Sequence, residues 1–147
     1  MNRRFRCPIA VHLLVFEGDR VLLSRRANTG FGDGAYSVVA GCCDGGESAS
    51  AAMCREAAEE AGIVIGCDDL RLATTVHRRA GAAWESIDLF FQVTRHLETV
   101  ENREPDKCSH LAFFPLSALP DSLLPYVRHA LTNALAGVAY SEFGWDD

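Results

Sequence analysis

Residues 41–63 of this 147-residue chain read GCCDGGESASAAMCREAAEEAGI, and this stretch has two parts. Residues 41–47 contain three glycines and are predicted to form a loop whose backbone can approach a ligand closely. From Ser48 to Ala61 there is no glycine or proline, and alanine and glutamate dominate. We therefore predict a helix that starts at the polar Ser48 and ends where Gly62 can form the C-cap.

Three acids of this predicted helix carry the chemical interpretation. Glu56, Glu59 and Glu60 stand at spacings i, i+3 and i+4, so they share one helix face. Like charges at such spacings repel by roughly a few tenths of a kcal/mol per pair, and a hard cation such as Mg²⁺ would compensate for this repulsion. A solvated acidic face is the alternative. The glycine loop and the alanines assigned to the opposite face favour the cation; these alanines are Ala51, Ala52 and Ala58.

At this point the chain resembles a known family. Gly41, Glu47 and the run from Arg55 to Ile63 match the complete Nudix signature, G-x5-E-x7-R-E-U-x-E-E-x-G-U, where U is apolar. The sequence is thus similar to Nudix hydrolases, and to their MutT-like members in particular. The resemblance implies an α+β fold, an α/β/α sandwich with a mixed β-sheet between helices, and a single domain over residues 1–147.

The resemblance also implies a role for each matching residue. Glu56, Glu59 and Glu60 would bind the metal together with the backbone carbonyl of Gly41, and one of these acids would also position or deprotonate the attacking water. Arg55 would orient a glutamate. Glu47 would support the site near the start of the helix.

Two residues outside the signature extend the implied site. Arg26, at the end of the second predicted strand, corresponds to an arginine that often contacts phosphate; the alternative is an exposed arginine at a strand end. Glu104 lies in a loop where some MutT-type members place a further metal ligand or catalytic base, and the alternative is a solvent-exposed acid. The run EPDKC at residues 104–108 is also similar to a motif of nucleotide-cleaning members.

Short apolar runs and turn residues predict the other elements. The strand at residues 7–16 is expected to pair with residues 21–26 as a hairpin across the turn at residues 17–19. Further strands are predicted at residues 36–40, 70–77, 86–93 and 110–114, a second helix at 124–135, and loops at 27–35 and 101–107, whereas residues 140–147 receive no clear assignment.

Composition narrows the range of partners. The net charge of −6 argues against a basic surface that would bind polymeric nucleic acid. The six cysteines include no CxxC pair, so we expect reduced thiols in a cytoplasmic protein. No apolar run is long enough to cross a bilayer, which predicts no membrane partner. The expected partner is a small nucleotide, bound by a monomer or a homodimer.

The implied reaction is hydrolysis of a phosphoanhydride bond with Mg²⁺, or Mn²⁺ in its place. Signatures of the coenzyme A, NADH and ADP-ribose classes are absent, which favours a nucleoside triphosphate, with an oxidised one such as 8-oxo-dGTP as one option, cleaved to a monophosphate and pyrophosphate. Two alternatives stay open. One is a hydrolase of another nucleoside diphosphate derivative, ADP-ribose or a dinucleotide. The other is a non-catalytic Nudix-fold nucleotide sensor, against which the complete set of glutamates argues.

Aromatic and histidine side chains are weaker candidates. Phe31, Tyr36, Phe113 or Phe114 could stack on a base, but aromatic residues in short strands more often belong to the core. The histidines in predicted strands, His12, His77 and His110, are expected to be structural. Ordinary packing is expected for Phe143 and Trp145 in the tail.

Overall fold

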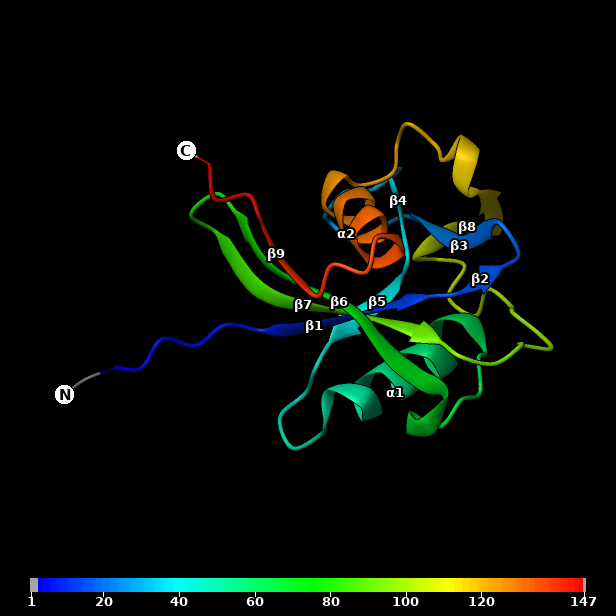
Figure 1. Ribbon diagram of the computed structural model, residues 1–147, viewed down its shortest axis with the longest axis horizontal. Coiled ribbons are helices and arrows are strands. Elements are labelled where there is room, and N and C mark those ends of the chain that lie inside the picture. The colour runs from blue at the N-terminus through cyan, green and yellow to red at the C-terminus, as the bar shows by residue number, and fades with distance from the viewer. Residues whose placement is uncertain (1–2, 147) are drawn as a thin grey trace.

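The protein, described here by a computed structural model covering residues 3–146, has two β-sheets, with one helix on each side of the larger sheet (Figure 1). The strands are β1 Ile9–Leu14, β2 Phe16–Glu17, β3 Arg20–Arg26, β4 Tyr36–Ser37, β5 Val39–Cys42, β6 Leu70–Ala80, β7 Trp84–Val93, β8 Cys108–Pro115 and β9 Tyr140–Phe143. The helices are α1 Ala49–Ala61 and α2 Pro125–Leu135, and two 3₁₀ turns occupy Cys67–Asp69 and Leu116–Ala118.

The larger sheet is mixed, as expected for an α+β sandwich. Its strand order is β5-β1-β7-β6-β9, with β1 parallel to β7 and β6 parallel to β9. The β1–β5 and β6–β7 pairs are antiparallel. In the smaller sheet, β3 pairs with β2, β4 and β8. The sequence-based expectation of a mixed sheet between helices is confirmed, and the second sheet adds to it.

The predicted hairpin between residues 7–16 and 21–26 is wrong for most of its length. Only β2 turns back onto β3, where Phe16 pairs with Val21 and Glu17 with Arg20, whereas β1 lies in the other sheet between β5 and β7. The physical reason is burial, because five of the six residues of β1 are buried. A strand with such a continuous apolar run is stable when both of its faces are covered. The predicted strand at residues 36–40 likewise divides into β4 and β5, which belong to different sheets.

Helix α1 has the predicted caps. The Ser48 hydroxyl accepts a hydrogen bond from the backbone N–H of Ala51 at 3.1 Å. Gly62 adopts φ 63°, and its N–H closes the last turn on the carbonyls of Ala57 and Ala58. This left-handed conformation strongly favours glycine over residues with a side chain.

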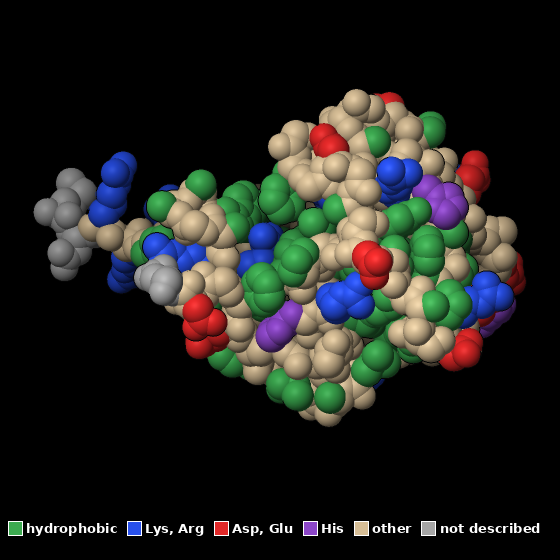
Figure 2. All heavy atoms as spheres, turned by 90° about the horizontal axis from the view of Figure 1, so that it is seen from above, with side chains coloured by type: hydrophobic (Ala, Val, Ile, Leu, Met, Phe, Trp, Pro, Cys, Tyr) green, Lys and Arg blue, Asp and Glu red, His purple; other side chains and the backbone are tan. Residues whose placement is uncertain are grey.

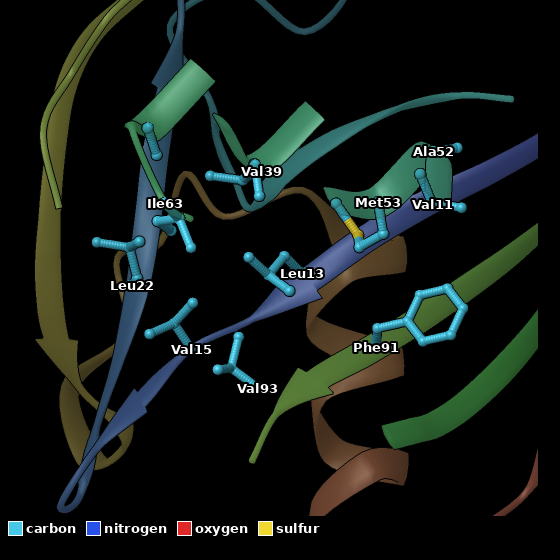
Figure 3. Packing of buried hydrophobic residues seen from close by; sticks show 12 residues of the cluster. Val11, Leu13, Val15, Leu22, Val39, Ala52, Met53, Ile63, Phe91 and Val93 are labelled. Atoms are coloured by element: carbon cyan, nitrogen blue, oxygen red, sulfur yellow. The ribbon is translucent and has the colours of Figure 1, made fainter. Parts of the chain in front are cut away.

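The inner face of α1 packs on one side of the larger sheet. Met53 points toward Leu13 in the apolar cluster shown in Figure 3. The buried alanines of the helix are Ala52, Ala57 and Ala61. Of the alanines assigned to this face from the sequence, Ala52 is buried but Ala58 is exposed. The small side chains let the helix lie close to the sheet, and the acids beside them then face the end of β5.

Helix α2 covers the opposite side of the larger sheet (Figure 1). Its buried face contributes Tyr126, Val127, Ala130 and Leu131 to a second apolar cluster, in which Phe90 of β7 is fully buried. The tail left unassigned from the sequence forms β9, an edge strand parallel to β6. The Trp145 indole then donates to the His77 carbonyl at 2.9 Å, so the tail packs on the sheet.

The surface carries mixed charge. On the face in Figure 2, acidic and basic side chains are interspersed among apolar ones, and basic side chains gather along the extended N-terminal segment. Within residues 3–146, no helix is both long and apolar enough to cross a membrane. All six cysteines are free thiols.

Candidate active site

Arg55 organises the carboxylates at the start of the site. Its guanidinium donates to Glu47 at 2.7 and 3.2 Å, and to Glu56 at 2.7 Å. Ion pairs with Asp44 and Glu59 are longer, at 3.4 and 3.5 Å. The pKa of Glu47 is lowered, chiefly by its hydrogen bonds from Arg55 and from the Asp44 backbone. Arg55, the residue expected to orient a glutamate, thus makes its main hydrogen bonds to Glu47 and Glu56.

Glu56 lies directly against Gly41, the first residue of the signature. A Cβ at position 41 would overlap the Glu56 carboxyl group, so this close approach requires glycine. The side chain of Glu56 is 15% exposed. Burial raises its pKa, the Arg55 hydrogen bond opposes this change, and the charges of Glu59 and Glu104 add to it.

Glu60 is the most deeply placed acid of the helix. Its Oε2 accepts a hydrogen bond from the backbone N–H of Ala40 in β5 at 3.0 Å. Burial raises the pKa of Glu60 from 4.5 to about 8, with a further increase from the charges of Glu56 and Glu104. The three acids that share a helix face in the sequence thus have different surroundings, because Glu59 remains 52% exposed.

The donor chemistry of this region suits a hard divalent cation. Within residues 3–146, no three His, Cys, Asp or Glu side chains are grouped as a formed metal site, since Glu60 is bonded to Ala40 and Glu56 to Arg55. Yet burial raises the pKa of both Glu56 and Glu60, and the charges of neighbouring acids raise each pKa further. Oxygen ligands of this kind are those that Mg²⁺ prefers, and a cation would relieve the repulsion.

A small pocket of about 120 Å³ opens beside Glu60. Glu104 and Lys107 from the loop before β8 line it together with Arg26 at the end of β3. Glu104 is half-buried, and its charge contributes to the raised pKa of Glu60. The structure therefore brings Glu104 and Arg26, the two candidates outside the signature, next to the helix acids.

Arg26 lies between this acidic pocket and a second, larger one. Its guanidinium donates to the Phe31 carbonyl at 2.7 Å and to the Thr29 hydroxyl at 3.1 Å, which fixes it against the loop that follows β3. The same side chain lines a mostly apolar pocket of about 360 Å³. That pocket extends from Gly41 to the far end of β6 and β7, and its lining includes His12, Phe31, Arg78, Trp84 and Tyr126.

Sequence reasoning did not identify the buried charged pair formed by Asp88 and Arg78, of which Arg78 lines the larger pocket. Arg78 and Asp88 are 7% and 0% exposed, and the Arg78 Nε donates to Asp88 Oδ2 at 2.6 Å. Burial alone would raise the pKa of Asp88, but His12 and Arg78 outweigh it and lower that pKa. A signal was available, because both residues occupy buried positions in the alternating pattern of their strands.

The other aromatic candidates divide between pocket and core. Phe31 lines the larger pocket, whereas Phe113 and Phe114 pack against the two apolar clusters, as expected for core residues. Tyr36 also packs in the core, and its hydroxyl meets His110 Nδ1 at 2.8 Å.

The family model of the NUDIX domain matches residues 7–134 of the chain. The chain belongs to the NUDIX domain family. A MutT NUDIX hydrolase from Burkholderia pseudomallei superposes with a TM-score of 0.79 at 24% identity, covering 88% of this chain and 98% of that one. The NUDIX domain of Shewanella oneidensis NrtR, crystallised with ADP-ribose, gives 0.71 at 19% identity, covering 90% and 89%.

A curated human relative matches part of this NUDIX chain. The mitochondrial NAD(P)H pyrophosphatase NUDT13 of Homo sapiens is 45% identical over 58 residues, which is 40% of this chain but only 16% of that protein. The match therefore supports the family and leaves the substrate to be argued from the site. Members of the family generally use a divalent metal ion.

Proposed function

We propose that this NUDIX protein is a Mg²⁺-dependent hydrolase that cleaves a nucleoside triphosphate to a monophosphate and pyrophosphate. The observation that carries the proposal is the position of Arg26 between two pockets. One of them is lined by Glu60, Glu104 and Lys107 and would receive phosphates with their cation. The other has aromatic and apolar walls and a volume of about 360 Å³, which suits a nucleoside.

Four residues of the chain would bind the divalent cation, and a fifth would orient one of them. Glu56 and Glu60, with the carbonyl of Gly41 and the more exposed Glu59, would hold the cation. When bound, that ion would neutralise phosphate oxygens and stabilise charge on the leaving group. Arg55 would keep Glu56 oriented through its 2.7 Å hydrogen bond.

In the hydrolysis step, a water molecule bonds to phosphorus and gives up a proton. A water oxygen bonds to one phosphorus of the α–β anhydride, and the bond from that phosphorus to the bridging oxygen breaks. The water proton passes to a carboxylate, for which Glu56, Glu60 and Glu104 are the half-buried candidates. Arg26 would bind a phosphate and hold the chain of phosphates between the two pockets.

A second candidate is a nucleoside diphosphate derivative such as ADP-ribose. It is favoured by the fold similarity to the NrtR domain, which was crystallised with ADP-ribose. The same acids would serve either reaction, so the distinction lies in what occupies the larger pocket and its rim.

The test is a product analysis with purified protein. Wild type is incubated with Mg²⁺ and separate nucleoside triphosphates, ADP-ribose and a dinucleotide, and the products are resolved by ion exchange. We expect monophosphate and pyrophosphate from a triphosphate, and a loss of orders of magnitude in kcat for Glu60→Gln without unfolding. Glu17→Gln, which removes an exposed acid remote in sequence, is the control. Cleavage of ADP-ribose alone, or normal turnover by Glu60→Gln, would overturn the proposal.

A further inference from the structure

The floor of the larger pocket contains polar groups that the hydrolysis itself does not use. Arg78 is held there on three sides. Its Nε donates to Asp88 at 2.6 Å, and its guanidinium carbon lies 3.9 Å from the Tyr126 ring centroid and 5.8 Å from that of Trp84. Cation–π contacts at these distances fix the plane of the guanidinium as well as its charge.

The two amino nitrogens of Arg78 have no acceptor among the described residues. Within residues 3–146, the hydrogen bond from Nε is the one that this side chain makes. The side chain is 8% exposed, and its amino nitrogens are not among the fully buried polar atoms that lack a partner, so they keep access to the pocket. An arginine carries five N–H donors, so a ligand in the pocket can accept hydrogen bonds from the amino groups that Asp88 leaves unused. The guanidinium end is therefore a preorganised pair of donors within the lining of a pocket.

His12 provides a second, independent indication of a ligand at this place. It is 2% exposed, and neither ring nitrogen has a hydrogen-bond partner within the described chain. Its ring stacks on Phe90 with centroids 4.3 Å apart, and Nε2 lies 3.5 Å from Asp88 Oδ1. Buried polar side chains are normally satisfied, and His12 lines the same pocket as Arg78.

The walls of the pocket suit a flat ring. The Trp84 indole N–H donates to the Ser86 hydroxyl at 2.9 Å, and that hydroxyl donates to Asp88 at 2.9 Å. This chain of hydrogen bonds connects the aromatic wall to the carboxylate that also holds Arg78. Trp84 is 37% exposed and Phe31 50% exposed, so both aromatic side chains remain accessible for stacking.

We propose that Arg78 selects the base, with its two amino groups donating to the 6-carbonyl oxygen and the ring nitrogen 7 of a 6-oxopurine nucleotide. The inference rests on the proposed function and specifies its substrate class. Among the common bases, guanine presents two adjacent acceptors, its 6-carbonyl oxygen and nitrogen 7. Adenine has an amino group, a donor, beside its nitrogen 7. An adenine amino group would therefore face the Arg78 donors. Guanine and its 8-oxo form share the 6-carbonyl.

A series of bases tests the inference on the wild-type protein. The values of kcat/KM with Mg²⁺ are compared for GTP, ITP, 7-deaza-GTP and ATP, and dissociation constants are measured for the α,β-methylene analogues of GTP and ATP. A bidentate arginine contact predicts that GTP is favoured over ATP by roughly 10- to 100-fold. ITP should behave like GTP, and 7-deaza-GTP should lose most of the advantage. Equal values for GTP and ATP, or for GTP and 7-deaza-GTP, would overturn the inference.

The outcomes separate this inference from the proposed function. If GTP and ATP are hydrolysed equally, the hydrolase stands and the role of Arg78 in base selection fails. If no triphosphate is hydrolysed, the proposed function fails. In that case the analogue binding still decides whether the pocket prefers a 6-oxopurine.

Two variants test whether Arg78 acts through the base or only through the fold. Arg78→Lys keeps a positive charge beside Asp88 but removes the planar pair of donors. We expect the GTP-to-ATP ratio of kcat/KM to fall toward one. Arg79→Lys, the adjacent position on the opposite face of β6, is the matched control and should keep the ratio. If Arg78 only supported the fold, Arg78→Lys would lower kcat/KM equally for GTP and ATP. That result would contradict the inference. If Arg78→Lys does not fold, the base series on wild type decides alone.

Discussion

Replacing Glu60 by glutamine should make the metal-free protein more stable at alkaline pH. In the folded protein, burial raises the pKa of Glu60 from 4.5 to about 8, whereas in the unfolded chain the carboxyl group ionises near its ordinary value. Between these pH values the unfolded chain has lost a proton that the folded protein retains. The free energy of unfolding therefore falls as pH rises through this interval and becomes level above about 8.

The size of the effect follows from the same interval. At about 1.36 kcal/mol per pH unit, the interval from 4.5 to about 8 corresponds to a loss on the order of 5 kcal/mol. For a domain of this length each kcal/mol changes Tm by roughly 2–4 °C, so the loss over the whole interval amounts to roughly 10–20 °C. Glutamine carries no charge and can still accept the N–H of Ala40, which lies 3.0 Å from Oε2.

The assay is thermal unfolding in EDTA at pH 6 and pH 9. Between these pH values the Tm of wild type should fall by more than the Tm of Glu60→Gln. At pH 9, Mg²⁺ should raise the Tm of wild type again but leave the Tm of the variant unchanged. Glu59→Gln, which removes an acid with 52% exposure from the same helix, should keep the pH dependence of wild type. Identical pH dependence in wild type and Glu60→Gln would refute the reasoning.

Three further substitutions test the support of the site. Arg55→Lys cannot hold Glu47 and Glu56 together, so kcat measured with Mg²⁺ and GTP should fall by about 10- to 100-fold. Gly41→Ala forces a Cβ into the Glu56 carboxyl group; urea titration should show a stability loss of about 1–3 kcal/mol, and turnover should fall with it. Ser48→Ala removes the cap on Ala51 and should lower stability by about 1 kcal/mol with kcat unchanged, because the cap lies outside the pocket.

Local patterns predicted the helix and its acids well because their determinants are local. The absence of Gly and Pro between Ser48 and Ala61, with a capping residue at each end, is enough to define α1. The signature spacing then identified Gly41, Glu47 and Arg55 as neighbours of the acids. Their contacts, such as the overlap that any Cβ at Gly41 would cause, depend on how β5 meets the helix.

The pairing of strands depended on tertiary contacts that a local pattern does not contain. A turn at residues 17–19 predicts a hairpin, but it cannot show that β1 leaves β3 for the centre of another sheet. The Arg78–Asp88 pair likewise requires the register of β6 and β7. In the sequence, Arg78, Asp88 and His12 are each ordinary strand residues. The structure distinguishes them, because all three are buried and Asp88 contacts the other two, which line the larger pocket.

The most direct test concerns the acids of α1 and a divalent ion. Binding of Mn²⁺ is measured by electron paramagnetic resonance for wild type and for the double variant Glu56→Gln/Glu60→Gln, each with and without α,β-methylene-GTP. We expect wild type to bind the ion more tightly when the analogue is present and the double variant to lose this binding while remaining folded. Equal Mn²⁺ affinity in the two proteins would contradict the assignment of these carboxylates.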